Sequence, residues 1–122
     1  MKTDPRHHLG RLGERLAAEH FERLGYEVLA RNHRTRWGEL DLVLSMPGRL
    51  VFCEVKTRRL GSGDPWDSLH AVKRSQVRKM ASAYLVEGPA RAWSDELRFD
   101  AVGVVIDAQD RLVRLDHLEG AF

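Results

Sequence analysis

Apolar side chains recur at helical spacing in two long segments of the chain. The first segment predicts a helix over residues 9–24 that ends at Gly25, and about the first eight residues are expected to be flexible. The second predicts a helix over residues 68–86 that ends at Gly88-Pro89. Each helix has one apolar face, which indicates that it packs against a second layer.

Shorter apolar segments between and after these helices predict strands. They cover residues 26–31, 39–44, 50–57, 97–106 and 112–118. A turn at residues 46–49 joins the second and third strands into a hairpin, and glycines with a proline predict a mobile loop over residues 58–66. The order helix, three strands, helix, two strands predicts an α/β fold with a central mixed five-stranded sheet flanked by helices.

The composition is that of one folded domain. With 122 residues and 43% hydrophobic side chains, residues 1–122 can form a single domain with a real core. The single cysteine rules out an intramolecular disulfide, and no apolar run approaches the ~18 residues of a membrane span. Because the first residues contain no leader-like apolar segment, we expect a soluble, cytoplasmic protein with no membrane partner. The pI of about 9.0 permits a polyanionic partner without requiring one.

The predicted hairpin carries an unusual arrangement of acids. If its two strands pair symmetrically about Pro47-Gly48, Asp41 lies opposite Glu54, and Glu39 lies opposite Lys56. Two carboxylates in directly opposed positions repel each other, and a cation between them would remove that repulsion. A register slip of one residue would separate all four side chains from this arrangement.

A hard divalent cation such as Mg²⁺ or Mn²⁺ prefers oxygen ligands of this kind. Asp41 and Glu54 supply two carboxylates, and Glu14 in the first helix, at the edge of its apolar face, can complete a three-carboxylate site. Such a metal polarises a phosphoryl oxygen and acidifies its bound water, while Lys56 can orient the water or stabilise developing charge. The alternative is an exposed sheet face with ordinary cross-strand ion pairs and a solvated Glu14.

Basic and polar residues near the hairpin suggest contacts with a nucleic-acid backbone. We single out Arg36, Arg58, Lys73 and Gln76, because Lys73 and Gln76 fall inside the apolar face of the second helix and need polar partners there. Trp37 could form a groove wall on which an unpaired base stacks, although a lone tryptophan is more often part of a core.

Three other features favour structural interpretations. Asp100 begins a strongly apolar strand, and an ion pair with Arg98 is the favoured interpretation. Cys53 lies in an apolar strand pattern and is expected to be a buried, inert thiol. His7-His8 could form a weak adventitious metal site, whereas the other four histidines show no ligand spacing, so a zinc site is not expected. No nucleotide-binding glycine motif or GxSxG motif is present.

Taken together, these motifs resemble the YraN-like bacterial family, which is similar to archaeal Holliday-junction resolvases and belongs to the PD-(D/E)xK phosphodiesterase superfamily. The resemblance extends over about residues 10–105. It is carried by Gly13-Glu14, Arg31-Asn32, Gly38-Glu39-Leu40-Asp41-Leu42-Val43, Val51-Phe52-Cys53-Glu54-Val55-Lys56-Thr57-Arg58, Lys73 and Arg98-Phe99-Asp100.

The resemblance implies a restriction-endonuclease-like core in which Asp41, Glu54 and Lys56 are the signature catalytic residues and Glu14 is the first-helix acid. Leu40 stands where the signature has its proline. The first hypothesis is therefore a metal-dependent endonuclease acting on DNA, branched or damaged, for which a homodimer would suit two cuts. The second is a non-catalytic nucleic-acid-binding module with the same fold, and the third is a structural domain.

Overall fold

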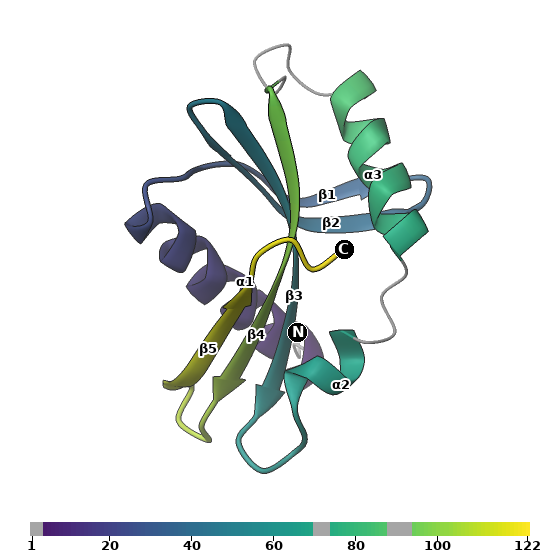
Figure 1. Ribbon diagram of the computed structural model, residues 1–122. Coiled ribbons are helices and arrows are strands. Elements are labelled where there is room, and N and C mark those ends of the chain that lie inside the picture. The colour runs from purple at the N-terminus through teal and green to yellow at the C-terminus, as the bar shows by residue number, and fades with distance from the viewer. Residues whose placement is uncertain (1–3, 70–73, 88–93) are drawn as a thin grey trace.

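One five-stranded sheet organises the protein, with helices on both of its faces (Figure 1). The computed structural model describes residues 4–69, 74–87 and 94–122. The elements along the chain are α1 (Pro5–Arg23), β1 (Glu27–Thr35), β2 (Gly38–Met46), β3 (Arg49–Arg59), α2 (Pro65–Leu69), α3 (Arg74–Glu87), β4 (Glu96–Ile106) and β5 (Leu112–Leu118).

The strands lie in the sheet in their sequence order, β1-β2-β3-β4-β5. All neighbouring pairs are antiparallel except β3 and β4, which are parallel because the chain crosses over through α2 and α3 between them. The predicted mixed five-stranded sheet is therefore confirmed, and the α/β architecture is consistent with a restriction-endonuclease-like core. No helix in the described part of the chain has both the length and the apolar character needed to cross a bilayer.

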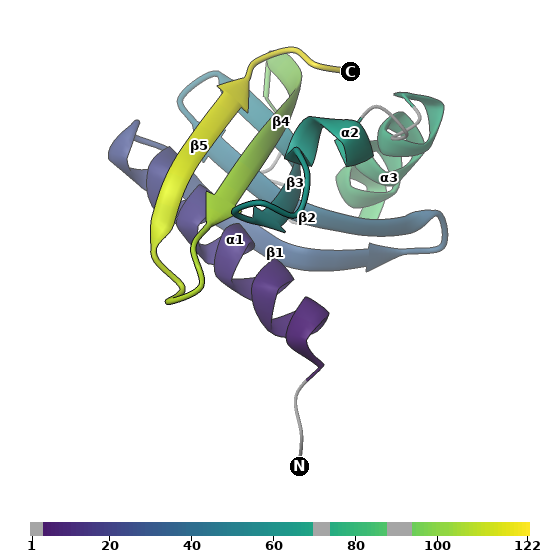
Figure 2. The same cartoon turned by 90° about the horizontal axis from the view of Figure 1, so that it is seen from below.

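The sheet separates two hydrophobic cores. Figure 2 shows α1 crossing one face of the sheet, with α2 and α3 placed on the other. In β3, Cys53 and Val55 point into the core on the α1 side, whereas Phe52 points into the core on the α3 side. Glu54, between these residues, therefore faces the α2 and α3 layer.

Helix α1 begins earlier than the apolar pattern predicted. The Asp4 side chain accepts a hydrogen bond from Arg6 N at 2.9 Å, and Pro5 fills the first helical position, so residues 5–8 are helical. Farther along, α1 approaches the sheet so closely that a Cβ on Gly13 would lie 1.7 Å from Thr57 Oγ1. This close approach brings the next residue, Glu14, to the sheet.

The second predicted helix corresponds to α2 and α3, and residues 70–73 between them lie outside the described residues. The expected mobile loop over residues 58–66 is also shorter than predicted, because Arg58 and Arg59 continue β3 alongside Val105 and Ile106 of β4. Helix α2 then packs on β4 at Gly103, where a Cβ would lie 3.0 Å from Pro65 Cβ. The crossover thus starts close to the sheet, beside the end of β3.

Candidate active site

Strands β2 and β3 separate part-way along their length, and the candidate site lies at this fork. Their pairing runs from Met46–Arg49 to Leu42–Cys53 in the register that the sequence predicted, and it ends there. Beyond that point β2 continues beside β1, while β3 continues beside β4. Figure 1 shows β1 and β2 turning away from β3 toward α3. The next two positions after the last pair are Asp41 and Glu54.

The Asp41 side chain fills the place of the missing backbone partner. Its Oδ2 accepts a hydrogen bond from Val55 N at 2.8 Å, which satisfies a donor that the departing strand leaves free. The Asp41 and Glu54 carboxyls also hydrogen-bond to each other. Asp41 and Glu54 therefore lie against each other as predicted. They meet through their side chains, however, because the backbone pairing of β2 with β3 ends one position earlier.

The predicted pairing of Glu39 with Lys56 is wrong. Because β2 has left β3 at this level, Glu39 pairs with Arg34 of β1 in the sheet, and their side chains lie 3.7 Å apart. Glu39 and Lys56 still line one cavity, as described below. The prediction from symmetric pairing about Pro47-Gly48 fails here because it assumes that both strands stay paired to their ends.

Helix α1 brings a third acid, Glu14, to the fork. Glu14 is half-buried, and its charge is felt by both Asp41 and Glu54. The side chain of Asn32 in β1 hydrogen-bonds to Glu14. Asn32 has φ 51° and lies between the pairs Arg31–Leu42 and His33–Leu40, so its place in the register is opposite Asp41.

Asn32 is the site residue to which sequence reasoning gave no role. Asparagine adopts positive φ more readily than most other side chains, so an asparagine inside a segment of strand-forming residues signals a local break in the strand. That signal was available, but the predicted strand stopped at residue 31. In the structure β1 continues to Thr35 through this position, and the Asn32 amide turns toward Glu14.

The electrostatics of the fork are those of a buried acid cluster in which the positive charge of Lys56 only partly offsets the effect of burial on Asp41 and Glu54. Burial, followed by the neighbouring Asp41 charge, raises the pKa of Glu54 to about 9. Burial also raises the pKa of Asp41, although the Val55 N–H partly opposes this shift. The pKa of Glu14 is raised by burial and by Asp41. At neutral pH Glu54 therefore holds a proton that it shares with Asp41.

Several oxygens at the fork are buried without a partner. Glu14 Oε2, Asn32 Oδ1 and Glu54 Oε1 accept no hydrogen bond, and within the described ranges only one other buried side-chain polar atom, His33 Nε2, is in this condition. Unsatisfied buried oxygens are costly, and they are the ligand type that a hard divalent cation takes. Across the described residues, however, no three acidic, histidine or cysteine groups already surround one point. The donor set fits such a cation.

A cavity of about 280 Å³ adjoins the fork on the α3 side. Its lining residues are Glu39, Glu54, Lys56, Ser68, Gln76, Val77 and Met80. Lys56 follows Glu54 by two positions on β3, so both side chains point into this space. The predicted catalytic acids and lysine are therefore brought together at one end of a polar cavity.

The four residues predicted to bind nucleic acid have different surroundings. Gln76 lines the cavity, is exposed, and donates to the Trp37 backbone oxygen at 2.7 Å. Arg58 hydrogen-bonds to the Ser68 hydroxyl of α2. Arg36 is exposed beside the Trp37 ring, whereas Lys73 lies outside the described residues.

Trp37 is the centre of an exposed group of cations. The Arg36 guanidinium lies 4.9 Å and the Lys79 ammonium 4.6 Å from the centroid of its ring. The Trp37 residue is 40% exposed. We call Arg36, Trp37 and Lys79 the basic ridge. The hydrogen bond from Gln76 to Trp37 attaches this ridge to the wall of the cavity.

Residues 13–104 match the model of the family described as Uncharacterised protein family UPF0102. The chain belongs to this family. It is 42% identical to a UPF0102 protein of Acidothermus cellulolyticus, with 93% of this chain and 92% of the relative covered. A UPF0102 protein of Pelotomaculum thermopropionicum is 41% identical over 98% of this chain and 99% of its own. A third, from Nocardia farcinica, is 43% identical over 93% of this chain and 88% of its own.

The part of the chain that matches the UPF0102 model includes the whole fork. It begins at Gly13, the residue that brings α1 against Thr57, and it contains Glu14, Asp41 and Glu54. It ends within β4, so that β5 lies beyond it. The relatives of the family therefore share the residue range that builds the site.

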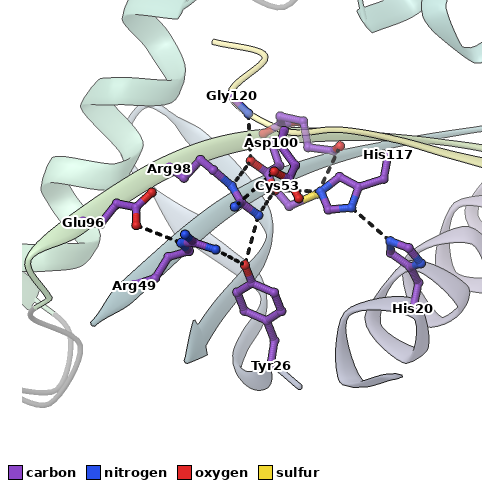
Figure 3. Close-up of polar contacts among 11 residues, drawn as sticks. His20, Tyr26, Arg49, Cys53, Glu96, Arg98, Asp100, His117 and Gly120 are labelled. Carbon is purple, nitrogen blue, oxygen red and sulfur yellow. Dashed lines mark hydrogen bonds and ion pairs between the residues drawn. The ribbon is translucent and has the colours of Figure 1, made fainter. Parts of the chain in front are cut away.

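A second buried polar network lies around Asp100 of β4 (Figure 3). Burial alone would raise the pKa of Asp100, but hydrogen bonds from His117 at 2.7 Å and from Arg98 at 2.8 Å lower it overall. The predicted ion pair with Arg98 is confirmed. Gly120 N adds a third donor at 3.1 Å. Asp100 is fully buried and fully satisfied, which is typical of a structural role.

Two histidines extend this network toward α1. His117 Nδ1 lies 3.0 Å from His20 Nε2, so β4, β5 and α1 are joined through one line of contacts. Histidine spacing in the sequence gave no sign of this, because the two residues are 97 positions apart. Cys53, paired with Asp100 in the sheet, is buried, and burial raises its thiol pKa well above its ordinary value, as expected for an inert side chain.

Proposed function

We propose that the chain is a Mg²⁺- or Mn²⁺-dependent endonuclease that hydrolyses phosphodiester bonds in DNA. One observation carries the proposal. Three acids from three different elements converge at a fork in the sheet, where buried oxygens lack partners and the pKa of each of the three carboxyls is raised. A purely structural site would be expected to satisfy these oxygens, as the site around Asp100 does.

Glu14, Asp41 and Glu54 are the residues that would hold the metal. When bound, the ion supplies Lewis-acid polarisation of a phosphoryl oxygen and acidification of water. For the cation to bind, Glu54 must release its proton, since a metal ligand has to be ionised. One oxygen of Asp41 accepts the hydrogen bond from Val55 N, and this contact fixes the orientation of the carboxylate. Asn32 holds Glu14 in the same way.

Lys56 completes the catalytic set on the cavity side of the fork. Its ammonium lies on the same strand face as Glu54, where it can donate to an attacking water or to a phosphate oxygen. The basic ridge supplies Arg36 and Lys79 to neutralise backbone phosphates of a substrate that enters this cavity. The family's similarity to resolvases favours branched DNA among the substrates.

The test is cleavage of branched and linear DNA by the purified protein with Mn²⁺, compared with the Asp41→Asn variant. The asparagine oxygen can still accept from Val55 N, so this variant should keep the fold while losing one metal ligand. Metal-dependent cleavage that is lost in Asp41→Asn is expected. Glu19→Gln, an exposed acid of α1, is the matched control and should cleave like wild type. Absence of cleavage, or equal cleavage by Asp41→Asn, would refute the enzymatic proposal.

A non-catalytic nucleic-acid-binding module is the second candidate, and the basic ridge favours it. The ridge is exposed and contacts none of the three acids in the described contacts, so it could bind phosphates without any metal. This alternative predicts salt-sensitive DNA binding that survives Asp41→Asn and falls in Lys79→Ala. Metal-dependent thermal stabilisation separates the two, because only a metal site raises the melting temperature by linkage.

A further inference from the structure

A hollow of about 490 Å³ adjoins the basic ridge on the outer side of α3. Trp37 lines it from the turn between β1 and β2, and Lys79, Ala83 and Val86 line it from α3. These three α3 residues follow the spacing of one helix face, on the side away from the buried Val77. Val86 is 85% exposed and Trp37 is 40% exposed, so the hollow presents apolar surface to solvent.

The turn between β1 and β2 holds Trp37 in a fixed position. Thr35 Oγ1 donates to Gly38 O at 2.8 Å and accepts from Trp37 N at 3.1 Å. Gln76 of α3 donates to Trp37 O, and a Cβ on Gly38 would lie 3.1 Å from Met80 Sδ, so the turn packs closely on α3. An aromatic side chain presented from such a turn loses little freedom when a ligand binds to it.

The charges around the hollow suit a polyanion. Among the described residues that line it, Arg78 and Lys79 are basic and Glu87 is acidic, and Arg36 adds a third cation beside the indole. Within the described contacts, neither Arg36 nor Lys79 forms an ion pair with a carboxylate. Arginine and lysine side chains in this condition can neutralise backbone phosphates.

The two cations beside the indole can give way to a base. An exposed cation–π contact changes an equilibrium about two- to fivefold, whereas stacking of one base on an aromatic side chain changes it about five- to 150-fold. The contacts of Arg36 and Lys79 with the Trp37 ring are of the weaker kind, because both cations are exposed. A base therefore replaces a cation on the ring, and the displaced cation is free to bind a phosphate.

We propose that this hollow binds an unpaired nucleotide of a DNA strand, with its base stacked on Trp37 and the adjoining phosphates on Arg36 and Lys79. Bases inside a duplex stack on their neighbours on both sides, so only an unpaired base offers a face to the indole. This inference rests on the proposed action on DNA, and it defines the substrate as a strand with an unpaired base near the cleaved bond. Trp37 precedes Asp41 by four positions, which is roughly 13 Å along a strand. A duplex strand rises ~3.4 Å per nucleotide, so the two sites lie about four nucleotides apart or fewer.

The test measures binding of three DNA ligands in a chelating buffer, so that neither metal nor cleavage affects the result. The ligands are a single strand of about 12 thymidylates, a strand of the same length made of abasic sites, and a blunt duplex. Only the first offers unpaired bases. Trp37→Ala should weaken binding of the thymidylate strand about tenfold or more, and it should leave the other two ligands within about twofold of wild type.

Three further variants separate stacking from charge and packing. Trp37→Phe keeps an aromatic face and should recover most of the affinity for the thymidylate strand. Lys79→Ala should weaken binding of all three ligands and reduce its salt dependence, because it removes one phosphate contact. Leu24→Ala, which removes an exposed apolar side chain at the end of α1, is the matched control and should bind like wild type. Quenching of a fluorescent base analogue in the single strand should occur with wild type and Trp37→Phe, and not with Trp37→Ala.

Two outcomes for Trp37→Ala would overturn the inference. Equal weakening of the thymidylate and abasic strands would show that the indole only positions the ridge, and unchanged binding would show that no base reaches it. A wild type that binds both single strands equally would overturn it as well. Because binding is measured without metal, stacking without any cleavage would refute the endonuclease proposal alone, and cleavage without stacking would refute this inference alone.

Discussion

Replacing Glu54 with glutamine is expected to stabilise the metal-free protein, and increasingly so as the pH rises. In the folded protein Glu54 retains its proton up to a pKa of about 9, whereas in the unfolded chain it ionises near 4.5. Between these values the unfolded state has released a proton that the folded state keeps. Stability is therefore lost as the pH rises through this window. Glutamine cannot ionise in either state, and its amide can still donate to Asp41.

The size of this loss of stability follows from the difference between the pKa of Glu54 in the folded and in the unfolded chain. Each pH unit between the two pKa values costs about 1.4 kcal/mol of unfolding free energy. From pH 4.5 to pH 7, the wild-type protein should lose about 3 kcal/mol through this one group. The Glu54 residue is only 8% exposed, so solvent screens little of the effect. For a domain of this size, that is a large part of the total stability.

The assay is urea denaturation in a chelating buffer at about pH 5, 6, 7 and 8. The difference in unfolding free energy between Glu54→Gln and wild type should grow by about 1.4 kcal/mol per pH unit. The control is Glu119→Gln, because the Glu119 side chain is 62% exposed. The unfolding free energy of this variant should change with pH as that of wild type does. If the Glu54→Gln curve also ran parallel to wild type, Glu54 would be ionised in the folded state, and the reasoning about the fork would be refuted.

Three further variants test other parts of the structure. Gly13→Ala should lower stability by about 1–3 kcal/mol in urea melts, because its Cβ meets Thr57, and Thr57→Ala in the same chain should recover part of the loss. Asn32→Gly should keep stability near wild type but weaken Mn²⁺ binding by about tenfold in calorimetry, and unchanged affinity would contradict the role given to this side chain. Asp100→Asn should cost about 3–5 kcal/mol, since it leaves the largely buried Arg98 with only the exposed Glu119 as an acidic partner, and a melting temperature near wild type would argue against this account.

The sequence predicts much of this fold because its local signals agree with the final packing. The short segments at residues 39–44 and 50–57 identified both strands of the hairpin, and symmetric pairing about Pro47-Gly48 gave their register as far as Leu42–Cys53. The apolar face predicted for the second helix contains Val77, Met80 and Tyr84, and all three side chains are buried in the structure. The point at which the pairing of β2 with β3 ends could not be predicted in the same way. It depends on a choice between two partner strands, which no local pattern records.

The residues of the site were predictable, whereas their contacts were not. Asp41 and Glu54 were identified from hairpin symmetry, and the structure joins them by a side-chain hydrogen bond beyond the last strand pair. The hydrogen bond from Val55 N to Asp41 exists only because the strands part. The contact of His20 with His117 likewise joins segments that share no local pattern. Long-range pairing of this kind is determined by the packing of α1 and β5 on the sheet.

The hydrogen bond between Val55 N and Asp41 Oδ2 gives the site a built-in spectroscopic reporter. Asp41 is at once a member of the acid cluster and the acceptor for one amide proton of the sheet. Any event that redistributes charge on its carboxylate must therefore change the environment of that amide proton. Its chemical shift and its rate of exchange with solvent can be followed by nuclear magnetic resonance in an unmodified protein. A single backbone resonance would thus register occupation of the fork without substrate, label or turnover.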